Sequence, residues 1–292
     1  MLSSNDPLVS TIAKSELKQS VRFAVPDFNP PFLTLDYGSP VLAKLACTKL
    51  HHLCQDRAAD KLLSLPDQGK VARALVKDHF GNGSLWIYSG LNIRFKDWRF
   101  VHRARLNLVP TNQNKHRWDD LQSPICRVCN TDPETLPHIL CHCPTNLVDV
   151  RGRHNAILGR LTNAIRYGEV RVDQQIPELN DECRPDIVIM ENNEVTVIDV
   201  MCPFENGDDA LKSAEDHKVN KYSHLVDHFK HEGKVCHVFG FVFGALGAWH
   251  LNNEAVLSQI RMSLSYRKLF RKLCCSDAIK HSADIYYKHI SQ

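Results

Sequence analysis

Residues 184–201 read Arg-Pro-Asp-Ile-Val-Ile-Met-Glu-Asn-Asn-Glu-Val-Thr-Val-Ile-Asp-Val-Met, and this stretch decides the fold. Two apolar runs flank the dipeptide Asn192-Asn193, and asparagine tolerates the positive φ that a two-residue hairpin turn requires. A turn at this dipeptide places Asp186 directly opposite Asp199, because each aspartate lies six residues from the nearer asparagine. Cross-strand partners have Cβ atoms about 4.5–5.5 Å apart. The stretch therefore predicts a hairpin with two carboxylates side by side at its open end.

The paired aspartates need a chemical reason, since Asp199 stands in an otherwise apolar strand and two like charges at this distance repel each other. A divalent cation between them would remove the repulsion. Carboxylate oxygens suit Mg²⁺, which keeps several waters and takes phosphate oxygens as further ligands. Asp186 and Asp199 are therefore candidate Mg²⁺ ligands. The alternative is that Asp186 begins a strand at the surface and Asp199 is the exposed end of its partner.

The segment that follows the hairpin, residues 213–230, has helical spacing. Four of its residues share one face: Ala214, Lys218, Lys221 and Leu225. A face that carries alanine and leucine packs on the sheet, so both lysines are expected to point towards the aspartates. A lysine beside a metal-bound water can orient the water and offset the charge of a phosphate. Lys218 and Lys221 are thus candidate catalytic residues, and the alternative is that both extend past the core to solvent.

Upstream of the hairpin, three cysteines and a histidine have the spacing of a zinc site. The order is Cys126, two residues, Cys129, eight residues, His138, four residues and Cys143. The two-residue gap puts two thiolates on one turn, where both can lie about 2.3 Å from one ion. His138 and Cys143 are expected to share a face of a short helix over residues 136–143, and the nearby Cys141 would point elsewhere. Four protein ligands leave no open position for a substrate, so the predicted Zn²⁺ is structural and helps to position nucleic acid.

The charge of the chain is uneven. The whole sequence has a net charge of +3, but residues 94–117 hold seven lysines and arginines against one aspartate, a net charge of +6. A helix over residues 97–108 would carry a basic stripe able to lie along phosphates. The candidate nucleic-acid contacts are Lys96, Arg99, Arg103 and Arg105. The alternative is a solvated helix face that borders the core.

The composition is that of a globular protein, with 43% hydrophobic and 24% charged residues. The odd count of 11 cysteines argues against a disulfide framework and favours a reduced, intracellular compartment. The longest uncharged apolar run, residues 238–249, is shorter than the roughly 18 residues that span a bilayer. Secreted and membrane classes are therefore set aside.

The predicted fold class is mixed, α+β or α/β, with a central mixed sheet and flanking helices after a helical N-terminal part and the zinc module. The nearly all-apolar strand expected at residues 235–243 suits a sheet covered on both faces. Residues 1–40, which contain five prolines, are expected to be irregular. Helices are expected at residues 41–65, 71–80, 97–108, 146–167, 213–230, 254–270 and 276–289.

Taken together, these residues resemble the C-terminal region of site-specific non-LTR retrotransposon polyproteins that insert into ribosomal RNA genes. The resemblance covers roughly residues 92–289. It is carried by Pro185-Asp186 and Asp199, the helical Lys218-x-x-Lys221-Tyr222, the CCHC knuckle with Pro144 and Arg153-His154-Asn155, and segments 103–111, 244–249 and 276–286. One departure is Met201, where the commoner nuclease pattern has a lysine, so the lysine must come from the helix.

The resemblance implies a restriction-enzyme-like endonuclease of the PD-(D/E)xK class that nicks double-stranded target DNA for target-primed reverse transcription. It implies four segments: a helical connector (1–92), the basic helix and zinc knuckle (93–145), the endonuclease (146–262) and a C-terminal helical tail (263–292). No polymerase motif is recognised in the chain, so we expect the polymerase on the same parent polyprotein. Element RNA is a further candidate partner, no membrane partner is expected, and the site of action would be the nucleus.

Two rival hypotheses belong to other classes. The chain could be a catalytically inactive nucleic-acid-binding remnant of such an element, in which case it would bind DNA without metal-dependent cleavage. It could also be a zinc-stabilised structural protein, which requires the basic segment and both lysines to be incidental.

Overall fold

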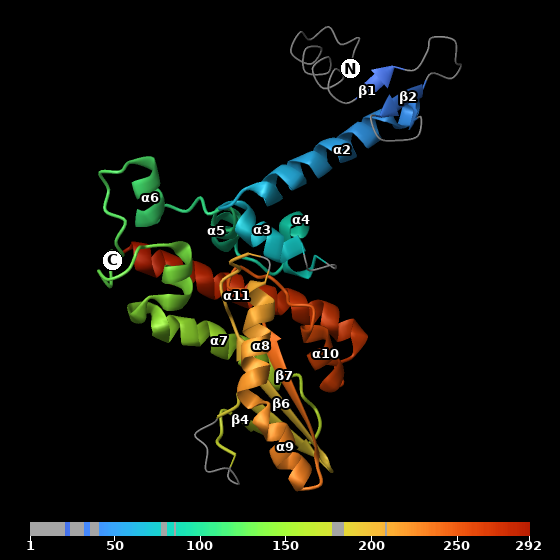
Figure 1. Ribbon diagram of the computed structural model, residues 1–292, viewed down its shortest axis with the longest axis vertical. Helices are drawn as coiled ribbons and strands as arrows, with labels where there is room; N and C mark the ends of the chain where they lie inside the picture. Colours follow the sequence, from blue (N-terminus) through green and yellow to red (C-terminus); the bar gives the residue numbers. More distant parts are fainter. Residues whose placement is uncertain are drawn as a thin grey trace. The chain divides into compact units, whose positions relative to one another are not determined.

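The chain forms a four-stranded mixed sheet in the order β4-β5-β6-β7, seen in the lower part of Figure 1. β4 (Glu169–Val172) pairs antiparallel with β5 (Ile187–Glu191), and β5 pairs antiparallel with β6 (Glu194–Met201). β7 (Val235–Val242) runs parallel to β6. The fold class is thus mixed, with flanking helices, as predicted.

The predicted hairpin is confirmed in both its turn and its register. Glu191 pairs with Glu194 across the dipeptide 192–193, and Asn192 has a φ of 52°, in the left-handed region that asparagine tolerates. Ile187 pairs with Ile198, so the two strands carry the register that sets the aspartates opposite each other.

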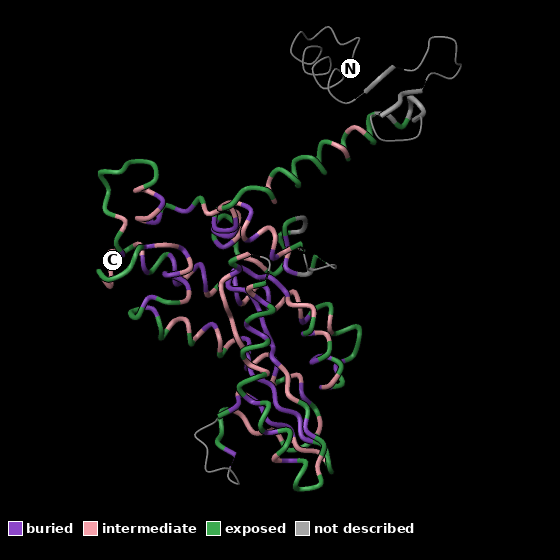
Figure 2. The backbone as a smooth tube through the Cα atoms, in the orientation of Figure 1, coloured by how far each residue is buried: buried purple, intermediate pink, exposed green. Residues whose placement is uncertain are grey.

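Helices cover both faces of the sheet, which explains why residues on both faces of β6 are buried. Val195 and Val197 lie in a core with Tyr222 and Leu225, where α8 (Ala210–Tyr222) and α9 (His224–His231) pack on β7. Ile198 and Val200 of β6 belong to the larger core, to which α7 (Leu147–Thr162) and α11 (Leu264–Ile290) contribute. Figure 2 shows the central strands buried along most of their length.

Several predicted helix bounds differ from the structure: α7 ends at Thr162 instead of Tyr167, and two stretches of helix are divided elsewhere than expected. The segment 213–230 forms α8 and α9 with a break at Ser223, rather than one helix. The break expected between 270 and 276 falls instead between α10 (Asn253–Gln259) and α11, a helix of 27 residues. Ser263 caps α11 by accepting a hydrogen bond from the Tyr266 N–H, whereas the two cysteines at 274–275 are buried mid-helix as small core residues.

The structure is a computed structural model that describes residues 21–23, 32–35, 41–76, 81–84, 86–176, 184–207 and 209–292. Its contacts divide the chain into two compact units, Met1–Leu62 and Leu63–Gln292. The knuckle, the sheet and the tail predicted as separate segments all belong to the second unit. The end of the helix expected at 71–80, and most of the irregular segment 1–40, lie outside the described residues.

The first unit holds a three-stranded antiparallel sheet of β1 (Val21–Phe23), β2 (Phe32–Leu35) and β3 (Val41–Leu42). The irregular conformation expected for residues 1–40 is therefore wrong for the residues of that segment that the structure describes. It also holds most of α2 (Ala43–Ser64), which confirms the helix expected at 41–65. The short elements of the second unit are α3 (Gly69–Val76), η1 (Asn82–Ser84), α4 (Trp86–Ser89), α5 (Phe95–Arg105), α6 (Asn112–Trp118), η2 (His138–His142) and η3 (Pro144–Asn146). Within the described part of the chain, no helix has the length and apolar character needed to cross a membrane.

Candidate active site and metal-binding cluster

The two predicted carboxylates lie together at the open end of the β5–β6 hairpin. The Asp186 N–H donates to Asp199 Oδ1 (3.2 Å), and the Val200 N–H donates to Asp186 Oδ2 (2.6 Å). Each carboxylate is therefore held by the backbone of the opposite strand. Asp199 lies on the same face of β6 as Val195 and Val197, which pack against α8. Helix α8 therefore covers the two carboxylates.

Helix α8 brings one of the two predicted lysines to this pair. Lys218 Nζ lies 2.5 Å from Asp199 Oδ2, and the side chains are 19% and 4% exposed. Lys221 Nζ donates instead to Tyr222 Oη (2.8 Å), which donates to the Arg184 carbonyl (3.1 Å). The expectation that both lysines point towards the aspartates is met by Lys218, which contacts a carboxylate, and not by Lys221, which contacts Tyr222.

A histidine of α7 completes the cluster, and sequence reasoning missed its role. His154 Nε2 lies 3.1 Å from Asp186 Oδ2 and 3.2 Å from the Val200 carbonyl oxygen. A carbonyl can only accept, so Nε2 carries a hydrogen that both oxygens share. The segment Arg153-His154-Asn155 was part of the resemblance, but the partners of this ring come from strands more than 30 residues away in the chain.

The pKa values of these groups follow from burial and from their neighbours. Burial raises the pKa of Asp199, the charge of Asp186 raises it further, and Lys218 opposes both effects only in part. Burial acts on Asp186 in the same direction, but the hydrogen bond and charge of His154 outweigh it and lower the pKa of that carboxyl. Burial disfavours the imidazolium of His154, yet the hydrogen bond to Asp186 leaves its pKa raised. The cluster thus holds one readily ionised carboxylate beside one that resists ionisation, as close like charges produce.

A cavity of about 500 Å³ opens beside the cluster. Its wall includes Asp186, Asp199, Lys218, Lys221 and His154. It also includes residues of the cysteine-rich segment: Pro137, Cys141 and His142. The carboxylates and the predicted zinc module therefore line one depression of the second unit.

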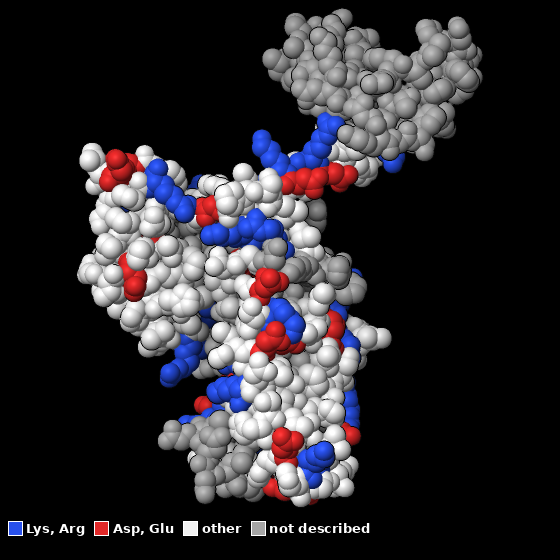
Figure 3. Space-filling model, viewed as in Figure 1, with Lys and Arg blue, Asp and Glu red and all other residues white. Residues whose placement is uncertain are grey.

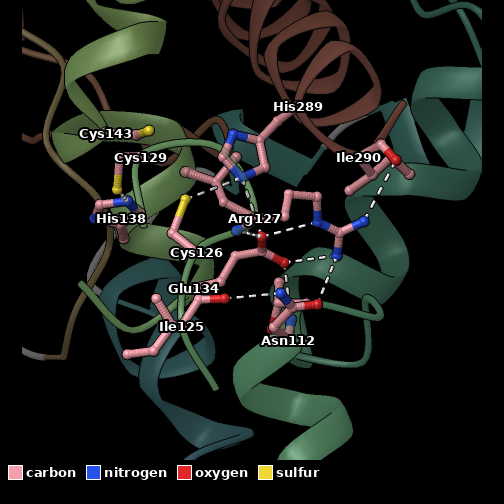
Figure 4. Close-up of polar contacts among 12 residues, drawn as sticks. Asn112, Ile125, Cys126, Arg127, Cys129, Glu134, His138, Cys143, His289 and Ile290 are labelled. Carbon is pink, nitrogen blue, oxygen red and sulfur yellow. Dashed lines mark hydrogen bonds and ion pairs between the residues drawn. The ribbon is translucent and has the colours of Figure 1, made fainter. Parts of the chain in front are cut away.

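The four predicted zinc ligands come together (Figure 4). The thiol sulfurs of Cys126, Cys129 and Cys143 and a ring nitrogen of His138 all lie within 4.8 Å of one another. Cys129 is half-buried and the other three residues are buried. Asn130, with a φ of 58°, closes the first turn by donating its N–H to the Cys126 carbonyl (3.0 Å). Three sulfurs and one imidazole nitrogen are a donor set that suits Zn²⁺.

The local structure of this cluster differs from the helix expected at 136–143. The Cys143 N–H donates to the His138 carbonyl (2.7 Å), which closes a π turn over η2. Residues five apart do not face each other on an α-helix, whereas the wider turn brings Cys143 over His138. The structure brings the four predicted ligands together, but the predicted helix type was wrong. Cys141 points away, with its Sγ near the Cys202 carbonyl and the Arg153 guanidinium.

The predicted nucleic-acid contacts of α5 lie in different environments, and Arg105 requires a correction. Arg105 is only 8% exposed, and its guanidinium donates to the carbonyls of Gly83 (2.8 Å) and Leu246 (2.7 Å). It is therefore a structural side chain, because burial forces its N–H groups to find internal acceptors. Lys96 pairs with Asp284 (2.8 Å).

Arg99 and Arg103 are exposed and stay candidate phosphate contacts. On the face of the molecule in Figure 3, basic side chains are interspersed with acidic ones. This face therefore does not carry a single broad basic surface.

The buried acid–lysine cluster and the Cys₃His cluster define the class: a mixed α/β protein with a candidate metal-dependent catalytic centre and a candidate structural metal site. No protein-family model matches the sequence. The chain is 28% identical over 186 residues to the Retrovirus-related Pol polyprotein from type-1 retrotransposable element R2 of Popillia japonica. It is 25% identical over 150 residues to the Retrovirus-related Pol polyprotein from type-2 retrotransposable element R2DM of Drosophila melanogaster.

These matches cover 61% and 49% of this chain, but only 38% and 14% of the two relatives. The chain is thus homologous to Pol polyproteins of R2 elements, which are non-LTR retrotransposons, and it spans less than half the length of either relative. The predicted relationship to non-LTR retrotransposons is confirmed at this level. The zinc knuckle and the PD-(D/E)xK endonuclease stay predictions.

Proposed function

We propose that this chain is the endonuclease part of a non-LTR retrotransposon polyprotein, with a PD-(D/E)xK fold, and that it nicks double-stranded target DNA by hydrolysing a phosphodiester bond. The nick would prime reverse transcription by a polymerase on the same parent polyprotein. The observation that carries the proposal is the convergence of Asp186, Asp199 and Lys218 beside a cavity of about 500 Å³. Homology to R2 Pol polyproteins supports it.

The cluster fits a divalent cation with a preference for oxygen ligands. Asp186 and Asp199 would hold Mg²⁺, because a cation between two carboxylates this close would offset their mutual repulsion. When bound, the metal supplies Lewis acidity and a water of lowered pKa. Lys218 lies where it can orient that water and stabilise charge on the phosphate. His154 holds the Asp186 carboxylate through Nε2.

The remaining parts of the proposal concern partners and location. Exposed Arg99 and Arg103 are proposed to contact DNA phosphates, and the Cys₃His cluster is proposed to hold a structural Zn²⁺ that fixes the wall of the cavity. Target-primed reverse transcription acts on chromosomal DNA, so we place the activity in the nucleus. Element RNA is a second proposed partner.

A plasmid-nicking assay tests the catalytic assignment. Purified protein with Mg²⁺ should convert supercoiled plasmid to the open-circular form, and EDTA should prevent this. Asp186→Asn and Asp199→Asn should abolish nicking, while Asp227→Asn, at an exposed position of α9, should nick as the parent does.

If the two active-site variants nick as fast as the parent, the assignment is wrong. DNA binding that weakens with salt, without metal-dependent cleavage by the parent, would instead identify an inactive nucleic-acid-binding remnant.

A further inference from the structure

A buried polar network joins the last turn of α11 to the Cys₃His cluster (Figure 4). Its centre is Glu134, which is 0% exposed. Glu134 accepts hydrogen bonds from the Asn112 N–H (2.8 Å), from the Arg127 N–H (3.0 Å), and from Arg127 Nε and Nη2 (2.9 and 2.7 Å). Arg127 also donates to the carbonyl of Ile290 (3.3 Å), the last residue of α11.

His289 of α11, which is also fully buried, lies between this network and a cysteine of the cluster. Its Nε2 is 3.5 Å from Cys126 Sγ and 3.3 Å from Glu134 Oε2. Its Nδ1 is 3.0 Å from the side-chain amide nitrogen of Asn146. These contacts decide which ring nitrogen carries the hydrogen.

The amide of Asn146 fixes the tautomer. The side-chain Nδ2 of Asn146 is 2.9 Å from the Ile139 carbonyl oxygen. A carbonyl can only accept, so the terminal atom that faces Ile139 must be the NH₂ nitrogen and not the amide oxygen. The second hydrogen of that group then points to His289 Nδ1, which must accept it. The hydrogen of the neutral ring is therefore on Nε2, directed at Cys126 Sγ and Glu134 Oε2.

Cys126, Glu134 and His289 are themselves close enough to hold a metal ion, but the hydrogen bonds argue against that arrangement. A ligating nitrogen must be free of hydrogen, and here Nε2 is protonated while Nδ1 already accepts from Asn146. The oxygens of Glu134 already accept from Asn112 and Arg127.

We propose that His289 is a positioning residue of the zinc cluster: its Nε2–H donates to the Cys126 thiolate and ties metal binding to the docking of the end of α11. A hydrogen bond to a ligating sulfur orients the ligand and offsets part of its charge, and loss of such an outer partner typically weakens metal binding about 10- to 100-fold. This inference rests on the proposed zinc site and not on the proposed nuclease activity.

Competition between the full chain and a chromophoric zinc chelator tests the proposal. His289→Phe, which keeps a flat ring but has no donor, should bind Zn²⁺ about 10- to 100-fold more weakly than the parent. His289→Gln, whose amide NH₂ can donate from nearly the place of Nε2, should recover most of that loss. Lys288→Ala is the matched control, since it removes only the exposed ion pair with Asp149.

Reciprocal coupling gives a second readout that needs no variant. Removal of zinc from the parent should increase amide hydrogen exchange at residues 286–290 as well as at residues 126–143. Equal zinc affinity for His289→Phe and the parent, or unchanged exchange at residues 286–290 after zinc removal, would overturn the inference. A parent that is folded but binds no zinc would refute the zinc site itself.

Discussion

Arg105 provides the sharpest test of how α5 is used, because the structure turns a predicted DNA contact into a core residue. Its guanidinium donates four hydrogen bonds: Nε and Nη2 to the Leu246 carbonyl, Nη2 to the Gly83 carbonyl and Nη1 to Ser84 Oγ. It also lies 5.1 Å from the ring centroid of Trp86. Replacement by alanine removes all of these contacts at once.

The magnitude can be worked out from the acceptors. Gly83 O still accepts from Trp86 Nε1 (2.8 Å), whereas Leu246 O loses both hydrogen bonds from Arg105. A buried carbonyl left without a donor costs about 1–3 kcal/mol. The lost cation–π contact adds about 0.5–2 kcal/mol. Arg105→Ala should thus lower the free energy of unfolding by about 1.5–5 kcal/mol, which for a unit of this size lowers Tm by about 3–20 °C.

Thermal unfolding followed by circular dichroism measures the loss, and fluorescence anisotropy with duplex DNA, well below the melting temperature, measures binding. Arg105→Ala should bind DNA as the parent does. Arg103→Ala, at an exposed position two residues earlier, should melt within about 1 °C of the parent, since surface changes have small effects. If Arg105→Ala melts with the parent and binds DNA more weakly, the guanidinium faces phosphate and the reasoning fails.

Three further predictions concern chemistry, charge and pH. Lys218→Met should slow plasmid nicking about 10²- to 10³-fold. Lys221→Met should slow it far less, because Lys221 contacts Tyr222 and not a carboxylate. Equal effects of the two changes would contradict the assignment of Lys218 as the catalytic lysine. Arg99→Ala should reduce the slope of log affinity against log salt by about 1 and leave Tm unchanged, and an unchanged slope would remove Arg99 from the interface. Glu205 is fully buried and accepts hydrogen bonds from the N–H groups of Leu246 (2.7 Å) and Ala248 (3.1 Å). Burial raises its pKa above the ordinary 4.5, so the contribution of this carboxyl to stability is complete below that pH and is lost as pH rises through the folded-state pKa. Denaturant unfolding should therefore show that the free energy of unfolding of the parent falls relative to that of Glu205→Gln as pH rises from about 4.5. A difference between the two proteins that does not change with pH would contradict the raised pKa.

The parts of the fold that sequence could predict are those fixed by short-range rules. The turn at residues 192–193 depends on two asparagines and on the period of a strand, and both are visible in the chain, so the positions of Asp186 and Asp199 followed. The proximity of the four candidate zinc ligands followed in the same way from the spacing of thiols and imidazole.

The parts that could not be predicted depend on distant partners. Arg105 looks like any basic helix residue until the Leu246 carbonyl, 141 residues later, is placed above it. His154 owes its role to strands that only the fold brings near. The break in the terminal helices was misplaced for a related reason, because two adjacent cysteines carry no local sign that a core will enclose them.

The contact between Cys126 and His289 spans 163 residues, which has a consequence for biosynthesis. Translation delivers the four candidate zinc ligands early, within 18 residues of one another, whereas the ring that borders them emerges from the ribosome long afterwards. Contacts of such high sequence separation form late and slow the folding of a domain. The nascent chain therefore passes through a period in which Cys126 is without its histidine partner, and maturation of this end of the protein is completed only after residue 289 has been synthesised.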